Sequence, residues 1–134
     1  MESPPTATRV LVLEDDPDVA ELAERLLREA LSGGCVVDHQ VSAARALASA
    51  QRKPPALVLL DIQLAQGDGF EFLKSFRAVP SMAAIPVIMM TAQEPDQAMA
   101  RSFAAGAVDY LTKPLRQGEL AARVARALGP RGLR

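Results

Sequence analysis

Five short apolar runs alternate with segments of helical spacing, and this alternation constrains the fold more than any other feature of the sequence. The runs occupy residues 9–13, 35–41, 56–61, 86–91 and 108–112. Three of them carry almost no polar residue before their last position, which is typical of a strand covered on both faces. Such strands occur in parallel sheets with a crossover helix between successive strands. The sequence therefore predicts an α/β fold with one doubly wound parallel sheet.

The segments that separate and follow the apolar runs predict five helices. Asp16 followed by Pro17 is a common helix start, with Asp16 as the cap, and Glu119 and Arg123 stand four residues apart, where an exposed ion pair is expected. The predicted helices span residues 17–30, 42–51, 70–79, 95–106 and 117–128.

A chain of 134 residues with 49% apolar and 23% charged residues fits one globular domain. We expect a flexible leader over residues 1–7, the domain over residues 8–128 and a tail over residues 129–134. The net charge of −1 gives no electrostatic case for nucleic acid or an anionic membrane as partner. No apolar run approaches the roughly 18 residues that span a bilayer.

The single cysteine and the single histidine exclude two kinds of site. Cys35 alone cannot form an internal disulfide and fits a reducing cytoplasm, and we interpret it as a small buried residue of a strand. His39 alone supports neither a multi-histidine metal site nor a zinc site with cysteine. We expect His39 to be a solvated residue near a strand end.

Polar residues gather at the carboxyl ends of four predicted strands. Glu14, Asp15 and Asp16 follow the first strand, Asp61 ends the third, Thr91 ends the fourth, and Thr112-Lys113-Pro114 follow the fifth. In open parallel sheets, ligands bind outside the carboxyl ends of the strands. The sequence therefore predicts a single site at this edge.

The residue types at this edge suit a hard cation and a phosphoryl group. Carboxylate oxygens favour Mg²⁺. Glu14, Asp15 and Asp61 carry −3 and Lys113 carries +1, so one Mg²⁺ would bring the sum to zero. Asp61 could then attack phosphorus, while Lys113 and Thr91 stabilise the phosphoryl oxygens.

Each of these residues, taken alone, has an ordinary alternative. Asp16 is more simply a helix cap than a metal ligand, Glu14 could be a solvated loop acid, and Asp61 could begin a turn. Thr91 could be an ordinary β-branched strand residue. The agreement of four strand ends is what favours a common site.

Four segments in order, "VLVLEDDPDV", "LVLLDIQLAQGDGFEFL", "PVIMMTA" and "GAVDYLTKPL", resemble the receiver domain of bacterial two-component response regulators. The resemblance covers about residues 8–128 and is to CheY-like, single-domain receivers. It implies a flavodoxin-like sheet of five strands in the order 2-1-3-4-5 with five helices.

The resemblance also implies roles for the residues at the strand ends. Asp61 would be the phosphoacceptor, and Asp15 and Asp61 would bind Mg²⁺ directly. Glu14 would act through bound water, and Gln63 would offer its backbone carbonyl to the ion.

Lys113 would contact the phosphoryl group, and the hydroxyl of Thr91 would move onto it. Tyr110 would be the aromatic switch that turns inward as Thr91 shifts, although a static strand aromatic is the alternative. The Lys113-Pro114 peptide is expected to be cis. The surface altered by the switch would be formed by the fourth helix, fifth strand and fifth helix; an ordinary solvated face is the alternative. The residues on this surface are Met99, Arg101, Tyr110, Arg116 and Arg123.

The chain departs from the pattern of the family at a few positions. Ala65 stands where many receivers have proline, so the loop after Asp61 could follow a different path, and Leu115 stands where an aromatic is frequent. Gln63 and Gln93 are polar and uncharged, which leaves the lifetime of the phosphoryl group open.

The function that follows is a cytoplasmic, phosphorylation-controlled signalling switch rather than a metabolic enzyme. Its partners would be a sensor histidine kinase or histidine phosphotransfer protein and a downstream target or output domain, and homodimerisation on phosphorylation stays open. The short tail favours a complete single-domain regulator or phosphoryl relay; a receiver from a longer regulator is the alternative. A Mg²⁺-dependent phosphatase would need an acid where Gln63 stands, and a flavin mononucleotide binder would need a phosphate loop after the first strand.

Overall fold

The molecule is built on one five-stranded parallel sheet. The computed structural model describes residues 7–31, 33–65, 67–92 and 95–129. The strands lie in the order β2-β1-β3-β6-β7, which is 2-1-3-4-5 when only the strands of this sheet are counted, as the resemblance implied. Their bounds are β1 Thr8–Leu13, β2 Cys35–Gln40, β3 Leu57–Asp61, β6 Val87–Thr91 and β7 Asp109–Thr112.

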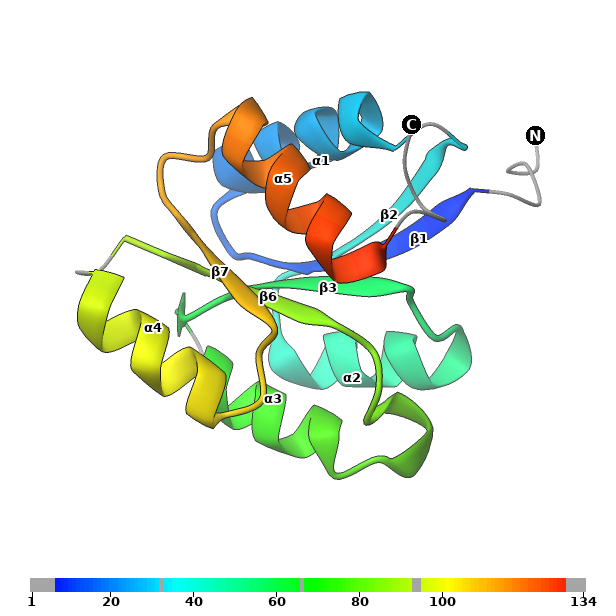
Figure 1. Ribbon diagram of the computed structural model, residues 1–134. Coiled ribbons are helices and arrows are strands. Elements are labelled where there is room, and N and C mark those ends of the chain that lie inside the picture. The colour runs from blue at the N-terminus through cyan, green and yellow to red at the C-terminus, as the bar shows by residue number, and fades with distance from the viewer. Residues whose placement is uncertain (1–6, 32, 66, 93–94, 130–134) are drawn as a thin grey trace.

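Five α-helices cover the two faces of this sheet. Figure 1 shows α1 and α5 on one face and α2, α3 and α4 on the other. The α/β prediction is confirmed, and most boundaries lie within two residues of the predicted ones. The predicted leader and tail lie almost wholly outside the described residues. The helices are α1 Pro17–Ala30, α2 Ala43–Arg52, α3 Gly69–Arg77, α4 Pro95–Ala104 and α5 Gln117–Leu128.

The core consists of two apolar layers separated by the sheet. Successive side chains of a strand point to opposite faces. Accordingly, Leu11 and Leu13 of β1 pack in the layer with α2 and α3, whereas Val10 and Val12 pack in the layer with α1 and α5. All residues of β3 and β6 are buried. This burial on both faces explains the uninterrupted apolar runs of the sequence.

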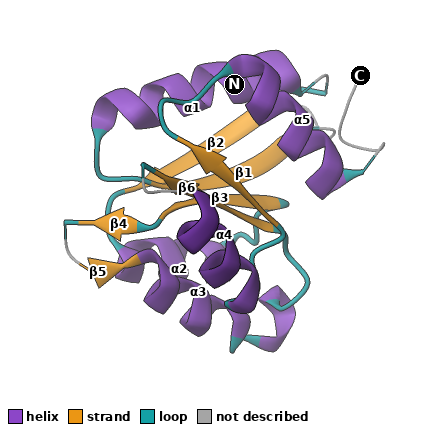
Figure 2. Ribbon diagram, turned by 60° about the vertical axis from the view of Figure 1, so that its left-hand side comes forward, coloured by secondary structure: helices purple, strands orange, loops and turns teal. Residues whose placement is uncertain are grey.

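Two short elements between the predicted ones were not expected. A hairpin pairs β4 (Gln63–Leu64) with β5 (Gly67–Asp68) in antiparallel register, and Figure 2 shows it outside the main sheet. A 3₁₀ helix, η1, spans Pro80–Met82. Elements of two or three residues are too short to show the periodicity from which helices and strands are recognised.

Arg77 at the end of α3 binds backbone carbonyl groups near the amino ends of β6 and β7, at the edge of the sheet opposite the acidic strand ends. Its Nη1 donates to the carbonyl oxygens of Met82 (3.2 Å) and Ile85 (2.7 Å), and its Nη2 donates to that of Gly106 (2.9 Å). Burial lowers the pKa of this guanidinium from its usual value. Gly106, with φ of +103°, makes the turn between α4 and β7.

The lone cysteine lies where the sequence placed it, and the lone histidine has an additional contact. Cys35 is buried at the start of β2, as predicted, and burial raises the pKa of its thiol to about 11. The ring of His39 is exposed, as predicted, but its Nε2 also donates to the carbonyl oxygen of Glu14 (2.7 Å). No helix among the described residues has both the length and the apolar character needed to cross a bilayer.

Candidate functional site

The polar residues of the strand ends line one pocket of about 210 Å³. Parallel strands of one sheet bring their carboxyl ends to the same edge, so residues separated by up to 99 positions in the chain become neighbours. Ile62 and Ala92 complete its wall. The predicted residues that line it are Glu14, Asp15, Asp16, Asp61, Gln63, Thr91 and Lys113.

Glu14 and Asp61 share the ammonium group of Lys113. Lys113 Nζ lies 2.8 Å from Glu14 Oε1 and 3.1 Å from Asp61 Oδ2. Burial alone would lower the pKa of Lys113, but its hydrogen bonds to the two carboxylates outweigh burial and raise the pKa above its usual value. The lysine therefore stays charged and offsets one of the negative charges of the pocket.

Glu14 is the most deeply buried of the acids, with no exposed surface. Burial raises the pKa of its carboxyl to about 6, against the lowering effects of Lys113 and of the Asp16 N–H, which donates to Oε2 at 3.1 Å. In the absence of a cation, the pocket is thus electrostatically unfavourable for a third negative charge.

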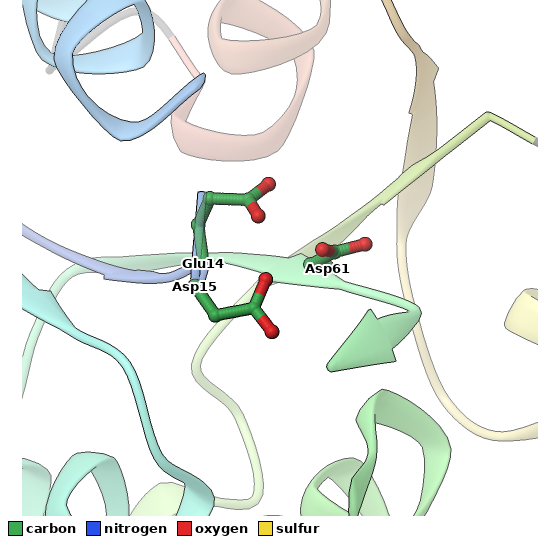
Figure 3. Close-up of side chains that lie close together, drawn as sticks. All are labelled: Glu14, Asp15 and Asp61. Carbon is green, nitrogen blue, oxygen red and sulfur yellow. The ribbon is translucent and has the colours of Figure 1, made fainter. Parts of the chain in front are cut away.

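The three carboxylates form a cluster that fits a divalent cation. Glu14, Asp15 and Asp61 each offer one oxygen, and these oxygens lie within 4.8 Å of one another. In Figure 3 the Glu14 and Asp15 carboxylates both point to the side on which Asp61 lies. With Lys113 the four side chains sum to −2, which one Mg²⁺ balances, and an all-oxygen donor set suits that ion.

Asp16 stands apart from this cluster in role. Its Oδ1 accepts from the Asp18 N–H (2.9 Å) and caps α1, as predicted, with Pro17 in the first turn. The Lys113-Pro114 peptide is cis, as the resemblance implied.

The two residues assigned to the switch lie on neighbouring strands. Thr91, at the end of β6, is buried, and its carbonyl oxygen accepts from the Lys113 N–H (2.8 Å). Tyr110 of β7 is half-buried; its ring meets that of Phe103 edge-on at 6.4 Å, and the Arg123 guanidinium lies 5.7 Å from its centre.

A groove of about 420 Å³ lies beside Tyr110, between α4, β7 and α5. Its walls combine apolar side chains with an ionic group: Asp109 pairs with Arg123 (3.4 Å) and Arg126 (2.8 Å). Of the predicted output surface, the groove contains Met99, Tyr110 and Arg123, whereas Arg101 and Arg116 lie outside it. Arg101 instead stacks on Phe70 at 3.9 Å.

Sequence reasoning missed two supports of the acidic pocket. His39 of β2 donates to the backbone carbonyl of Glu14. The Ala65 N–H, in the loop after β4, donates to Asp15 Oδ2. The first could have been found from the parallel register of β1 with β2, which pairs Val12 with His39; the second depends on the loop path and left no signal. Gln93 lies outside the described residues.

The sequence model of the response regulator receiver domain family matches residues 10–125. The chain belongs to this family. The receiver domain is 38% identical over 122 residues to the KDP operon transcriptional regulatory protein KdpE of Escherichia coli, with 90% of this chain and 51% of KdpE covered. It is 38% identical over 116 residues to the DNA-binding dual master transcriptional regulator RpaA of Synechocystis, with coverages of 87% and 47%. The chain thus spans about half the length of these curated relatives.

Solved structures show the same fold. The receiver domain of NtrX from Brucella abortus superposes with a TM-score of 0.80 at 27% identity, covering 90% of this chain and 98% of that one. The chemotaxis protein CheY4 of Vibrio cholerae gives a TM-score of 0.82 at 24% identity over 91% and 99% of the two chains. Receiver domains belong to two-component signalling systems and generally bind Mg²⁺ at an acidic pocket, the type of pocket that Glu14, Asp15 and Asp61 form.

Glu14→Gln is expected to stabilise the magnesium-free receiver domain by up to about 2 kcal/mol at pH 8. The pKa of Glu14 rises from 4.5 to about 6 on folding, so the folded protein holds this proton more tightly than the unfolded chain. The stabilising contribution of the protonated carboxyl is complete below pH 4.5 and is lost as the pH rises through about 6. Urea unfolding in chelator at several pH values measures the difference, which should vanish towards pH 4.5; a difference independent of pH would contradict the assignment.

Proposed function

We propose that this receiver domain accepts a phosphoryl group on Asp61, in a Mg²⁺-dependent reaction, from a histidine of a sensor kinase or phosphotransfer protein. The observation that carries the proposal is the position of Asp61. Its carboxylate lies in the acidic cluster, 3.1 Å from a lysine ammonium and beside two further acids. Family membership supplies the signalling context.

The chemistry requires a nucleophile, charge neutralisation and a leaving group. A carboxylate oxygen of Asp61 attacks phosphorus and forms an O–P bond, while the P–N bond of phosphohistidine breaks. The P–N bonding electron pair stays on the donor imidazole, which already carries a proton on its other ring nitrogen and therefore leaves as the neutral ring. Lys113 offsets charge on the phosphoryl oxygens, and the Gln63 N–H, 3.1 Å from Asp61 Oδ1, orients the nucleophile.

Asp15 and Asp61 would hold Mg²⁺ directly, Glu14 would act through water, and the backbone carbonyl of Gln63 would complete the protein ligands. When bound, the ion supplies positive charge where the phosphoryl oxygens collect. Without it, the net −2 of the four side chains repels the incoming phosphoryl group.

The response follows from a local rearrangement. The Thr91 hydroxyl donates to a phosphoryl oxygen once one is present, and the strand end moves inward with it. Tyr110 then turns into the vacated space and leaves its contacts with Phe103 and Arg123. The two arrangements of Thr91 and Tyr110 would differ by a few kcal/mol in free energy. Phosphorylation would change their relative populations without changing the fold.

The altered surface, formed by α4, β7 and α5, would control a downstream target protein or an output domain. The relatives KdpE and RpaA are transcriptional regulators about twice the length of this chain. We do not propose that the receiver domain itself binds DNA. We propose that it acts in the cytoplasm as a switch. The reactions that it catalyses would be its own phosphorylation and slow dephosphorylation. Phosphorylation-dependent homodimerisation is one form that the output could take.

Incubation with acetyl phosphate and MgCl₂ is expected to add one phosphoryl group to the intact protein. The added mass should disappear at alkaline pH, because acyl phosphates hydrolyse in base, and should resist acid better than phosphohistidine. Intact-mass spectrometry measures it, with chelator in place of MgCl₂ as the control. Equal labelling in chelator would contradict the magnesium requirement.

A further inference from the structure

Each acid of the carboxylate cluster accepts a hydrogen bond from one backbone N–H through one of its two oxygens. Glu14 Oε2 accepts from Asp16 (3.1 Å) and Asp61 Oδ1 accepts from Gln63 (3.1 Å), both donors standing two residues further along the chain. The donor to Asp15 Oδ2 is Ala65, 50 residues away. Only this third bond connects separate segments, since it ties the end of β1 to the loop after β4.

The Asp15 carboxylate has fewer fixed partners than its neighbours. Glu14 and Asp61 are each held a second time by Lys113, with Nζ to oxygen distances of 2.8 and 3.1 Å. Within the described part of the chain, the Ala65 N–H is the one hydrogen-bond or ion-pair partner of the Asp15 side chain. Asp15 is also less buried than the other two acids. Its orientation therefore depends on Ala65.

The loop that carries Ala65 is itself anchored. Asp68 of β5 pairs with Gln63 of β4, and its Oδ1 caps α3 by accepting from the Phe70 N–H (2.8 Å). Its Oδ2 lies 3.5 Å from Arg101 Nη2 of α4. A donor on an anchored hairpin has a fixed position relative to the sheet, so it can fix a side chain that reaches it.

We propose that the backbone N–H of Ala65 is a positioning group for the magnesium site. It holds Oδ2 of Asp15 and leaves the other oxygen to face the cluster. In Figure 3 one Asp15 oxygen points towards Glu14 and Asp61 and the other points away from them. A hydrogen bond to the non-ligating oxygen of a carboxylate orients the ligating one and typically changes metal affinity when it is removed. The inference rests on the proposed Mg²⁺ site.

The residue type at position 65 decides whether this bond can exist. Proline has no N–H, so a proline here would leave Asp15 without the donor. Receivers that have proline at this position lack this donor. Leu64, the preceding residue, lies in an extended strand, the conformation that a following proline requires. Ala65→Pro therefore removes the donor without requiring a change in the conformation of Leu64.

Calorimetric titration with MgCl₂ tests the role directly. Ala65→Pro is expected to weaken Mg²⁺ binding by about tenfold, whereas Ala65→Gly, which keeps the N–H, should stay within about twofold of the unmodified protein. Circular dichroism melting checks that both variants fold. An Ala65→Pro affinity equal to that of the unmodified protein would overturn the inference and leave the metal site intact. Absence of Mg²⁺ binding by the unmodified protein would overturn the proposed function as well.

Amide hydrogen exchange of the unmodified protein gives a second measurement that needs no proline variant. In chelator, the Ala65 amide of the unmodified protein is expected to exchange at least about tenfold more slowly than the same amide of the Asp15→Ala variant. This protection should persist when MgCl₂ is added. Equal exchange in the two proteins would show that Asp15 is not the acceptor and would overturn the inference.

Discussion

Asp61→Asn is expected to abolish phosphorylation by acetyl phosphate and by any histidine donor. Asparagine is similar in size and can still accept from the Gln63 N–H, but its neutral amide is a poor nucleophile and a poor Mg²⁺ ligand. It also loses the ion pair with Lys113. The loss of label should exceed about 100-fold in intact-mass spectrometry, because removing the nucleophile removes the reaction itself.

Asp16→Asn is the matched control for this experiment. Asp16 lines the same pocket, yet its carboxylate caps α1, and asparagine caps helices about as well as aspartate. This variant should keep most of the labelling rate. Label retained on Asp61→Asn, located by peptide mapping, would place the acceptor elsewhere and refute the site assignment.

Gly69→Ala is expected to destabilise the domain by about 3 kcal/mol and to impair the pocket. A Cβ on Gly69 would lie 2.2 Å from the carbonyl oxygen of Asp61 and 3.0 Å from Cα of Ile62. These are backbone atoms, so no side-chain rotation relieves the overlap. Either the start of α3 or the end of β3 must move, and the second movement displaces the acceptor itself. Denaturant unfolding measures the loss.

Gly118→Ala provides the opposite result in the same protein. Gly118 lies in α5, and a Cβ there would meet nothing within 4 Å. Alanine should stabilise the domain by about 0.5 kcal/mol, because it reduces the entropy of the unfolded chain. If Gly69→Ala and Gly118→Ala unfolded at the same denaturant concentration, the close approach of α3 to Asp61 would not constrain the fold.

The sequence was sufficient for the sheet and for the grouping of the acids. Strands buried on both faces leave continuous apolar runs, and β3 and β6 are of this kind. Once the strands are parallel, their carboxyl ends share an edge, so Glu14, Asp61 and Lys113 had to be close. The strand order and the cis peptide came from the resemblance, because neither follows from periodicity.

Contacts that depend on the path of a loop could not be predicted from the sequence. The Ala65 N–H carries no signal of its own, since every residue except proline has one, and its contact with Asp15 depends on the path of the hairpin.

The predicted pair of Glu119 with Arg123 was wrong. Glu119 Oε1 instead lies 3.3 Å from the Thr112 N–H, and Arg123 binds Asp109. Local spacing on a helix predicts a pair only when no better partner comes from another element.

The three carbonyls bound by Arg77 have a mechanical consequence for β7. The turn at Gly106 is bound to Arg77 of α3, and the Val108 N–H donates to the Val87 carbonyl (2.9 Å), so the amino end of this strand is fixed. If Thr91 and Tyr110 move on phosphorylation, we expect the displacement of β7 to be larger at Thr112 than at the fixed amino end. That carboxyl end leads into Lys113 and the acidic pocket.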